Sequence, residues 1–298
     1  MAYTEIKEKN NKKYFYRVQS VRKGNKISKK RVYLGVDLDK EKLSKIEDDA
    51  DKELMLLSTL LSDEEKKELE RIRKEHYSAK DHEESKYEAF VSLFTYDSTS
   101  IEGNTLTLQE TSQLLFEGIT PRKSLREINE VINHKEAFDF ILNYKKDITK
   151  KLILDLHQLV TKKTLKPELE NQIGKYRTLQ VYIRGTKWLP PKSKEVPREM
   201  GSLLSWYSKN KKKLHPLILA TYFHSAFETI HPFVDGNGRV GRLLMNFILH
   251  KHNFPMLNIP AQKKYLYYDA LESSQTKGDL RPLIHFLYTL IREEKIRF

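Results

Sequence analysis

Apolar residues recur at helical spacing through most of this chain of 298 residues. In the segment 84–102, Phe90, Phe94 and Ile101 fall on one face, and Gly103 then provides a natural end, which predicts an amphipathic helix. The same spacing predicts further helices at 217–230, 243–250 and 280–291, two between 125 and 165, and one or two charged helices between 38 and 80, the second beginning at Ser62.

Two segments show strand-like patterns instead. Residues 1–36 hold β-branched and aromatic residues in two runs around Gly24, which predicts a β-hairpin. Residues 174–191 combine strand formers with a turn at Gly185, which predicts a second hairpin in a helical region. The fold class is therefore mainly α, in three parts: a basic β-hairpin (1–36), charged connector helices (37–83) and a helical core (84–298).

Composition narrows the class of protein. Hydrophobic residues make up 39% of the chain, enough for a core, and no apolar run approaches the length of a membrane span. The N-terminal residues have no apolar stretch typical of a signal peptide, and the chain has no cysteine, which excludes disulfides, zinc–thiolate sites and thiol nucleophiles. We expect a cytoplasmic protein that does not associate with membranes.

The net charge of +13 is unevenly distributed. Residues 1–35 contain 11 Lys and Arg against 2 Asp and Glu, so +9 arises there. A basic segment with aromatic residues is typical of contact with a nucleic-acid backbone. It is equally compatible with a solubilising face or with a docking edge for a protein, and these alternatives stay open.

The candidate chemistry lies in twelve residues, His231–Arg242, which read HPFVDGNGRVGR between two apolar helical segments. Gly236 and Gly238 allow positive φ and close approach, so that successive N–H groups can converge on an anion at a helix N-terminus. Asp235 is a hard oxygen ligand that suits Mg²⁺, and His231 titrates near neutrality, as a general base should. Three further side chains can donate to phosphate oxygens: Asn237, Arg239 and Arg242.

These residues together favour a site for Mg²⁺ and a nucleotide, with transfer of a phosphoryl or nucleotidyl group to a hydroxyl. The plain alternative is a glycine-rich turn with a capping histidine and solvated arginines. Eight specified residues in register make that alternative improbable, at about one in 10¹⁰ per start position if each counts about one in twenty. The chain has no Gly-x-x-x-x-Gly-Lys-Ser/Thr run, so the site is not a P-loop.

At these residues the chain resembles the Fic (Fido) family, whose signature is H-x-F-x-[D/E]-G-N-G-R-x-x-R, and every defining position is matched. The resemblance implies transfer of AMP from ATP to a Ser, Thr or Tyr hydroxyl of a protein, this chain itself included. It implies His231 as the base and Asp235 as the Mg²⁺ ligand. The nucleotide would be bound by Gly236, Asn237, Gly238, Arg239, Val240, Gly241 and Arg242, with Arg239 on the β-phosphate and Arg242 on the γ-phosphate.

A second motif lies at the end of the predicted helix 84–103, where Ser98 and Glu102 share a face. Alone it reads as a polar helix end with a solvated glutamate. It is similar to the [S/T]-x-x-x-E-[G/N] motif of Fic proteins that carry an N-terminal inhibitory helix. The resemblance implies that Glu102 pairs with Arg242 and denies that arginine to the γ-phosphate.

The resemblance also assigns the hairpin 174–191 as the flap that positions the target, with its tip at Ile183, Arg184, Gly185 and Thr186. Tyr267 and Tyr268 match a tyrosine pair that lines the adenosine pocket, although such a pair is more often a packing feature. Gln275 stands where relatives often have Asn. A homodimer is a further expectation by analogy with the family.

Two rival interpretations remain. The same motif fits AMP removal, phosphotransfer or another nucleotide donor, and in AMP removal Glu102 would activate water. A rival of another class is a regulatory binding module that uses the basic residues 1–36 to bind nucleic acid or a partner.

Overall fold

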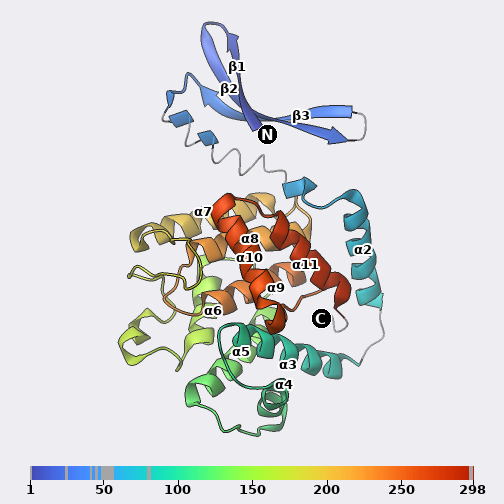
Figure 1. The fold of residues 1–298 in the computed structure, drawn as a ribbon, viewed down its shortest axis with the longest axis vertical. Coiled ribbons are helices and arrows are strands. Elements are labelled where there is room, and N and C mark those ends of the chain that lie inside the picture. Colours follow the sequence, from blue (N-terminus) through green and yellow to red (C-terminus); the bar gives the residue numbers. More distant parts are fainter. Residues whose placement is uncertain are drawn as a thin grey trace. The chain divides into compact units, whose positions relative to one another are not determined.

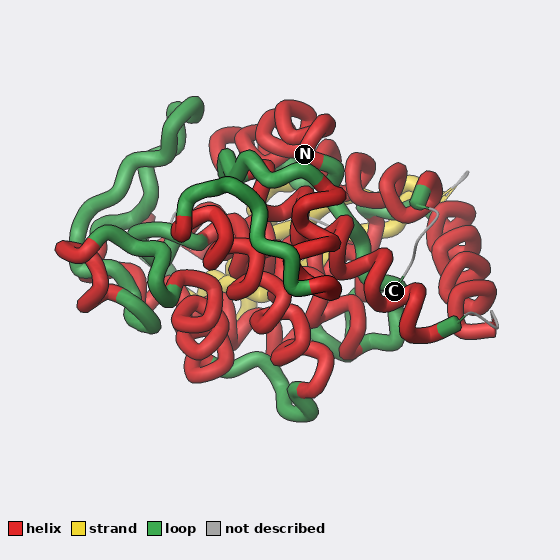
Figure 2. Tube along the Cα trace, turned by 90° about the horizontal axis from the view of Figure 1, so that it is seen from below, coloured by secondary structure: helices red, strands yellow, loops and turns green. Residues whose placement is uncertain are grey.

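The computed structural model describes residues 2–23, 26–40, 42–43, 46–47, 57–78, 82–294 and 298. The chain divides into two units, Met1–Leu60 and Leu61–Phe298. The first contains a small antiparallel sheet and the second is helical (Figures 1 and 2). A mainly helical fold is thus confirmed.

The sheet has three strands in the order β1-β2-β3: β1 (Ala2–Lys9), β2 (Lys12–Lys23) and β3 (Lys26–Val36). The prediction of two strands around Gly24 is confirmed for β2 and β3, whose pairing ends at Lys23 and Lys26, while residues 24–25 lie outside the described residues. The prediction missed β1. Asn10 and Asn11 both have positive φ, 53° and 56°, as a two-residue hairpin turn requires, and this asparagine pair was the available signal.

Among the sheet residues whose side chains are described, the buried apolar ones are Phe15, Val18 and Leu34. Leu38 and other partly buried residues pack against Phe15 and Leu34, so the unit has a small core of its own. The side chains of residues 19–31, which carry much of the positive charge, are outside the described set. The nucleic-acid interpretation of this segment stays a prediction.

The first unit ends with η1 (Leu57–Thr59), and the first helix of the second unit is α2 (Asp63–Ser78). Ser62 accepts from the N–H of Glu65 at 3.1 Å, and Glu65 accepts from the N–H of Ser62 at 2.6 Å, so the predicted helix start at Ser62 is confirmed. The following helices are α3 (Glu83–Ile101), α4 (Leu108–Ser112), the π-helix η2 (Gln113–Glu117), α5 (Leu125–Asn143), α6 (Lys150–Thr161), η3 (Pro167–Gln172) and η4 (Ser193–Glu195). The chain continues with α7 (Val196–Asn210), α8 (Pro216–Ile230), α9 (Asn237–Lys251), η5 (Ala261–Lys263), α10 (Lys264–Lys277) and α11 (Arg281–Glu293).

Helix α9 lies at the centre of this unit and packs against α3, α5, α6 and α8 (Figure 1). Every residue from Arg239 to Leu249 is buried, as expected for a helix that neighbours cover on all sides. The glycines of the motif lie at the N-terminus of α9. Because the surrounding helices hold α9, they also fix the position of this N-terminus.

The predicted hairpin at 174–191 is wrong in one respect, because no residue of this described segment is in a β-strand. The buried Arg177 holds its two arms instead, with Nη1 donating to the Leu179 carbonyl and Nη2 to the Pro191 carbonyl. The strand-like composition was misleading because Pro190 and Pro191 have no backbone N–H to donate to a neighbouring strand.

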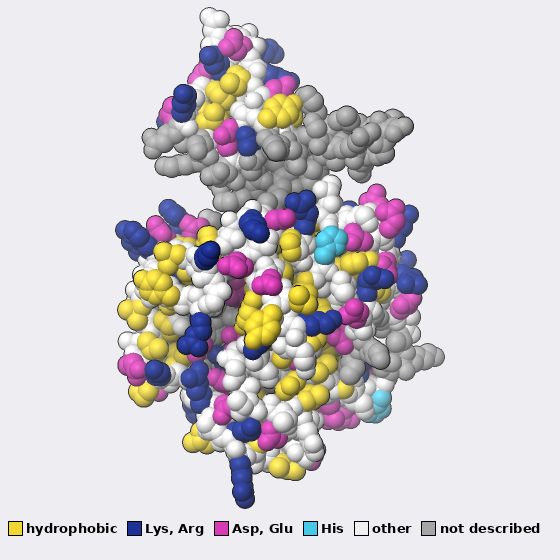
Figure 3. Space-filling view, viewed as in Figure 1, with side chains coloured by type: hydrophobic (Ala, Val, Ile, Leu, Met, Phe, Trp, Pro, Cys, Tyr) yellow, Lys and Arg dark blue, Asp and Glu magenta, His cyan; other side chains and the backbone are white. Residues whose placement is uncertain are grey.

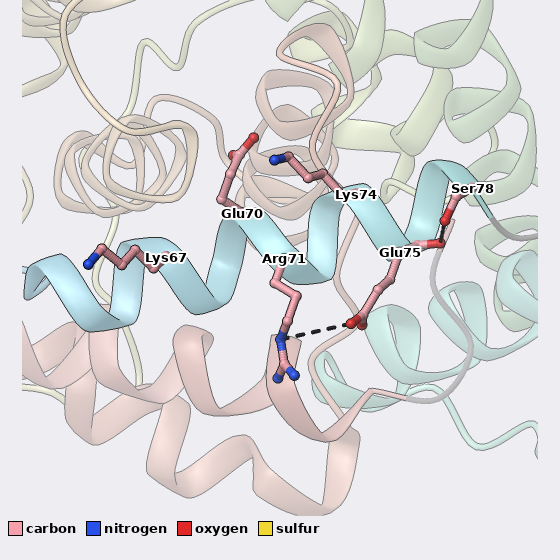
Figure 4. A pocket seen from close by; sticks show the side chains of 6 residues that line it. All are labelled: Lys67, Glu70, Arg71, Lys74, Glu75 and Ser78. Atoms are coloured by element: carbon pink, nitrogen blue, oxygen red, sulfur yellow. Dashed lines mark hydrogen bonds and ion pairs between the residues drawn. The ribbon is translucent and has the colours of Figure 1, made fainter.

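The visible face of the helical unit mixes basic and acidic side chains with scattered apolar ones (Figure 3). A recess of about 490 Å³ follows one face of α2 and is lined by Lys67, Glu70, Arg71, Lys74, Glu75 and Ser78 (Figure 4). None of the predicted site residues lines it, so we do not assign it a function. Among the described helices, none has both the length and the apolar character needed to cross a bilayer.

Candidate active site at the start of helix α9

The loop from His231 to Gly236 joins α8 to α9 and is closed by its own asparagine. The Asn237 side chain accepts from the Phe233 N–H and donates to the Phe233 carbonyl, both at 2.9 Å. We expected this side chain to donate to a bound anion. Its amide is instead hydrogen-bonded to the Phe233 backbone, so Asn237 fixes the conformation of the loop.

The three glycines of the loop and helix have different roles. Gly236 has φ of 81°, whereas Gly238 and Gly241 lie within α9, so positive φ is confirmed for Gly236 only. A Cβ at Gly238 would lie 2.1 Å from Oε1 of Glu102, and one at Gly241 would lie 2.3 Å from Oε1 of Glu228. These two glycines therefore make room for carboxylates.

Two buried residues outside the motif fix the loop, and neither was predicted from the sequence. His157 of α6 stacks on Phe233 at 3.8 Å between ring centroids and 3° between ring planes. Its Nδ1 accepts from the Gly174 N–H at 3.0 Å, so Nε2 carries the proton and faces the Asp235 carbonyl at 3.1 Å. Nε of Arg177 donates to the His231 carbonyl at 2.8 Å. Helical periodicity marks His157 as core and says nothing of these polar partners.

His231 ends α8 in a left-handed conformation, with φ of 49° and ψ of 63°. For a non-glycine residue this conformation is uncommon, and here the Phe227 carbonyl, which accepts from its N–H at 2.9 Å, and the Arg177 bond hold it. Burial lowers the pKa of His231 to about 4, against an opposing effect of Glu102. The imidazole is therefore neutral at neutral pH, the form that a general base requires.

Asp235 and Arg239 face each other across the mouth of the loop. Oδ1 of Asp235 accepts from the Gly236 N–H at 2.6 Å and from Nη2 of Arg239 at 3.1 Å, while Oδ2 lies 3.5 Å from Nη2 of Arg126. Arg239 is 2% exposed, and its Nε and Nη1 make no hydrogen bond, although Nη1 lies 3.7 Å from a carboxylate oxygen of Glu130. Unsatisfied buried donors of this kind favour an anionic ligand.

Arg242 forms the contact predicted for an inhibitory glutamate. It is 1% exposed, and its Nη2 donates to Oε1 of Glu102 at 2.7 Å and to the Ser98 carbonyl at 2.8 Å, while Nε donates to Oγ of Ser98 at 3.0 Å. Burial opposes the charge on Arg242, but Glu102, together with Tyr267 and Glu228, raises the pKa of this arginine above its ordinary value. The predicted helix end is confirmed, since α3 ends at Ile101 and Gly103 follows with φ of 101°.

The Glu102 carboxylate thus lies both on Arg242 and directly over Gly238, at the N-terminal turn of α9. This turn has no side-chain cap, so its N–H groups and helix dipole favour an anion there. The glutamate occupies the place where the sequence predicts that phosphates bind.

The predicted flap tip lies partly against α10. Oγ1 of Thr186 donates to Oε1 of Glu272 at 3.0 Å, and the indole N–H of Trp188 donates to the Thr229 carbonyl at 2.9 Å. Gly185 has φ of 85°, which confirms the turn. Ile183 is partly exposed and Arg184 is exposed.

The tyrosine pair divides into two environments. Tyr267 is 1% exposed and its hydroxyl lies 2.7 Å from Nε2 of His224, so it is mainly a core residue. Tyr268 is 41% exposed, and its hydroxyl donates to the Ile101 carbonyl at 3.3 Å. Of the two, Tyr268 has surface free for a ligand.

The described residues contain no group of three or more His, Cys, Asp or Glu side chains arranged for a metal ion. Asp235 is a single partly exposed carboxylate beside the predicted phosphate position. That environment suits Mg²⁺, which is commonly held by one or two carboxylates together with phosphates and water.

Part of the chain matches a known protein family. Residues 147–249 match the Fic/DOC family model. The protein adenylyltransferase Fic of Nematostella vectensis is 35% identical over 198 residues, 64% of this chain and 45% of that protein. The protein of the same name from Drosophila melanogaster is 38% identical over 197 residues, 64% of this chain and 39% of that protein. The chain thus spans less than half the length of these curated relatives.

Solved structures give the same result for the fold. A Fic-domain-containing signaling protein from Bacteroides thetaiotaomicron has a TM-score of 0.68 and 27% identity, over 77% of this chain and 94% of that one. Fic-1 from C. elegans also has a TM-score of 0.68, with 26% identity over 86% of this chain and 76% of that one. The resemblance seen in the sequence is confirmed.

Proposed function

We propose that this chain, whose residues 147–249 match the Fic/DOC family model, is a protein adenylyltransferase that moves AMP from ATP to a hydroxyl group of a protein. The observation that carries the proposal is the meeting of His231 with the uncapped start of α9 and two buried arginines, Arg239 and Arg242. This combines a neutral base with a site for a polyanion, which is what in-line nucleotidyl transfer needs.

Each group at the site has a role in the proposed reaction that follows from its position. The N–H groups at the start of α9 receive the phosphates, Arg239 supplies its unpaired donors to the β-phosphate, and Arg242 receives the γ-phosphate. His231 takes the proton from the target Ser, Thr or Tyr hydroxyl as its oxygen attacks the α-phosphorus, and pyrophosphate leaves. Tyr268 and the flap tip at Ile183–Thr186 flank the nucleotide and the target segment.

Asp235 would hold Mg²⁺ together with phosphate oxygens. The ion would offset negative charge on the phosphates as it develops. The carboxylate is partly exposed, and its present partners, Arg126 at 3.5 Å and Arg239 at 3.1 Å, are cations that an arriving phosphate can also engage. The side chain is therefore free to exchange one positively charged partner for another.

The chain is held in an inhibited state by Glu102. Its carboxylate occupies Arg242 and the space above Gly238, so a nucleotide triphosphate must displace it or bind with its phosphates misplaced. A charged pair of this kind shields a site without necessarily adding stability.

Intact mass after incubation with Mg²⁺ and ATP tests the proposal on three proteins: the wild type, Glu102→Gly, and Glu102→Gly with His231→Ala. A gain of roughly 329 Da, an AMP adduct, in Glu102→Gly alone is the expected result. The assay is run with the chain alone and with added protein substrates, because the target need not be the chain itself.

A gain of roughly 80 Da would replace AMP transfer by phosphotransfer. An adduct that persists in the double variant would contradict the role of His231. If no variant gains mass, an AMP-modified protein offered to the wild type distinguishes AMP removal from an inactive site.

A further inference from the structure

A buried carboxyl group next to His231 has no part in the proposed function so far. Glu228 lies on α8, one turn before His231, and is 7% exposed. Its Oε2 lies 3.8 Å from Nδ1 of His231. Oε1 of Glu228 and Nδ1 of His231 are buried and make no hydrogen bond of normal geometry with a described group, and the backbone of Glu228 also favours a proton on His231. A buried carboxyl group with one unsatisfied oxygen therefore lies beside the unsatisfied Nδ1 of the proposed base.

The central helix keeps space for this carboxyl group. A Cβ at Gly241 would lie 2.3 Å from Oε1 of Glu228 and 3.0 Å from Nδ1 of His224. Any larger residue at this position of α9 would push the carboxyl group away from its place. Gly241 is helical, so backbone conformation does not explain the glycine, whereas space for Glu228 does.

Charged and titratable groups from four helices surround Glu228. His224 and His231 come from α8 itself, Arg242 from α9, Glu102 from the end of α3 and Tyr267 from α10. Burial raises the pKa of Glu228 to about 8; Arg242 opposes the shift and Glu102 adds to it. With Glu102 in place the group is thus mostly protonated at neutral pH, and loss of Glu102 favours the carboxylate.

We propose that Glu228 is a positioning residue for His231, an inference that rests on the AMP transfer proposed above: as a carboxylate it accepts from Nδ1–H and so leaves Nε2 bare to act as the base. A carboxylate behind a catalytic imidazole fixes its tautomer and stabilises the imidazolium. A small rotation of either side chain closes the distance of 3.8 Å to a hydrogen bond.

The proposed step balances as follows. The target hydroxyl gives its proton to Nε2 of His231 while its oxygen forms a bond to the α-phosphorus of ATP. The bond from that phosphorus to the bridging oxygen breaks, and pyrophosphate leaves with the electron pair. The imidazolium, held through Nδ1–H by Glu228, then returns its proton to solvent.

Glu102 then acts on the base as well as on the phosphate site. Its negative charge adds to the effect of burial in favouring a proton on Glu228, and a protonated carboxyl group accepts from Nδ1–H more weakly and cannot offset the imidazolium charge. Release of Glu102 frees Arg242 and, through the same rearrangement, promotes ionisation of Glu228.

The test uses Glu102→Gly as the parent and adds Glu228→Gln or Glu228→Asp. The control is Glu199→Gln, a partly exposed glutamate on α7. Glutamine keeps the size and an acceptor oxygen but cannot ionise. We expect Glu228→Gln to lower kcat about ten- to hundredfold, the range for loss of a charge-assisted hydrogen bond, with KM for ATP within about twofold. The parent rate should rise with pH through one ionisation below about 8. Glu228→Gln should lose this rise, Glu228→Asp should retain it, and Glu199→Gln should match the parent.

A second measurement does not depend on transfer. Ring nitrogen shifts of His231, assigned by NMR with His231→Ala, report its tautomer and its pKa. Loss of a neighbouring anion should lower the pKa of His231 in Glu228→Gln relative to the parent. If the parent transfers AMP and the glutamine variant keeps its kcat, pH profile and His231 pKa, the inference is overturned.

The two proposals can fail separately. An inactive parent whose His231 pKa still responds to Glu228→Gln would remove AMP transfer and leave the pairing intact. A glutamine variant that loses affinity for ATP and thermal stability while its pH profile is unchanged would show a merely structural glutamate. If Glu228→Gln does not fold, Glu228→Asp decides, because loss of the pH-dependent rise in a folded, carboxylate-bearing variant contradicts the proposal.

Discussion

Replacement of Glu102 by glycine should make this protein less stable and more active at once. The substitution removes the carboxylate that accepts from Nη2 of Arg242 at 2.7 Å and leaves the two bonds from Arg242 to Ser98. Glycine fits the backbone, because Glu102 follows the last residue of α3 with φ of −85° and ψ of 0°.

The magnitude follows from that single contact. A hydrogen bond to a charged group contributes about 1.5–3 kcal/mol, and Arg242 is 1% exposed, so little solvent replaces the lost partner. At about 2–4 °C per kcal/mol for a chain of this size class, the Tm should fall by several degrees. In the wild type, the γ-phosphate must replace this hydrogen bond before it can bind Arg242. Without that cost, the rate of AMP transfer should rise about 10- to 150-fold, at about 1.4 kcal/mol per factor of ten.

Two assays check the two signs: thermal unfolding without ligand, and the initial rate of AMP incorporation from labelled ATP. Glu102→Gln, which keeps size and loses charge, should lie between the wild type and Glu102→Gly. Glu88→Gln, an exposed change on the same helix, should alter neither quantity. An unchanged rate in Glu102→Gly, with ATP binding intact, would refute the inhibitory role of the pair.

Three further predictions follow from the site. His157→Phe keeps the stack on Phe233 and loses both hydrogen bonds; in the Glu102→Gly parent it should weaken ATP binding about tenfold in calorimetry, and unchanged affinity would contradict its role in holding the loop. Gly238→Ala in that parent should likewise weaken ATP binding about tenfold, since the methyl group enters the phosphate position; equal affinity would place the phosphates elsewhere. Asp235→Asn should abolish the dependence of ATP binding on Mg²⁺, and a retained dependence would exclude Asp235 as its ligand.

Much of the helical framework could be predicted because local signals and burial agree. The helix 84–102 has an apolar face and ends at Gly103, and both features appear in α3. The Glu102–Arg242 pair was predictable only through the family motif, because 140 residues separate its partners and no local pattern joins them.

The remainder of the site depends on contacts that a single sequence does not encode locally. Arg177 lies in a segment that resembles a strand, yet it is buried and binds carbonyl groups of both the flap and the loop. Strand propensity reflects how well a side chain fits a pleated surface. It does not indicate that backbone carbonyl groups of this segment accept from an arginine side chain instead of from a neighbouring strand. The missed strand β1 has the opposite cause, since its residues are mostly polar and only Asn10-Asn11 marked the turn.

The glycines of α9 show why a motif can be recognised correctly and explained incompletely. Backbone freedom accounts for Gly236, but the helical Gly238 and Gly241 are there because a side chain would collide with Glu102 or Glu228. Each glycine accommodates a carboxyl group near Arg242, and the charge on Glu102 disfavours ionisation of Glu228. A triphosphate that displaces Glu102 would bring its own negative charge to Arg242, so ionisation of Glu228 requires that Mg²⁺ and Arg239 take up part of that charge. The dependence of transfer on Mg²⁺ and on pH should therefore be coupled, with the pH-dependent rise moving to lower pH as Mg²⁺ saturates.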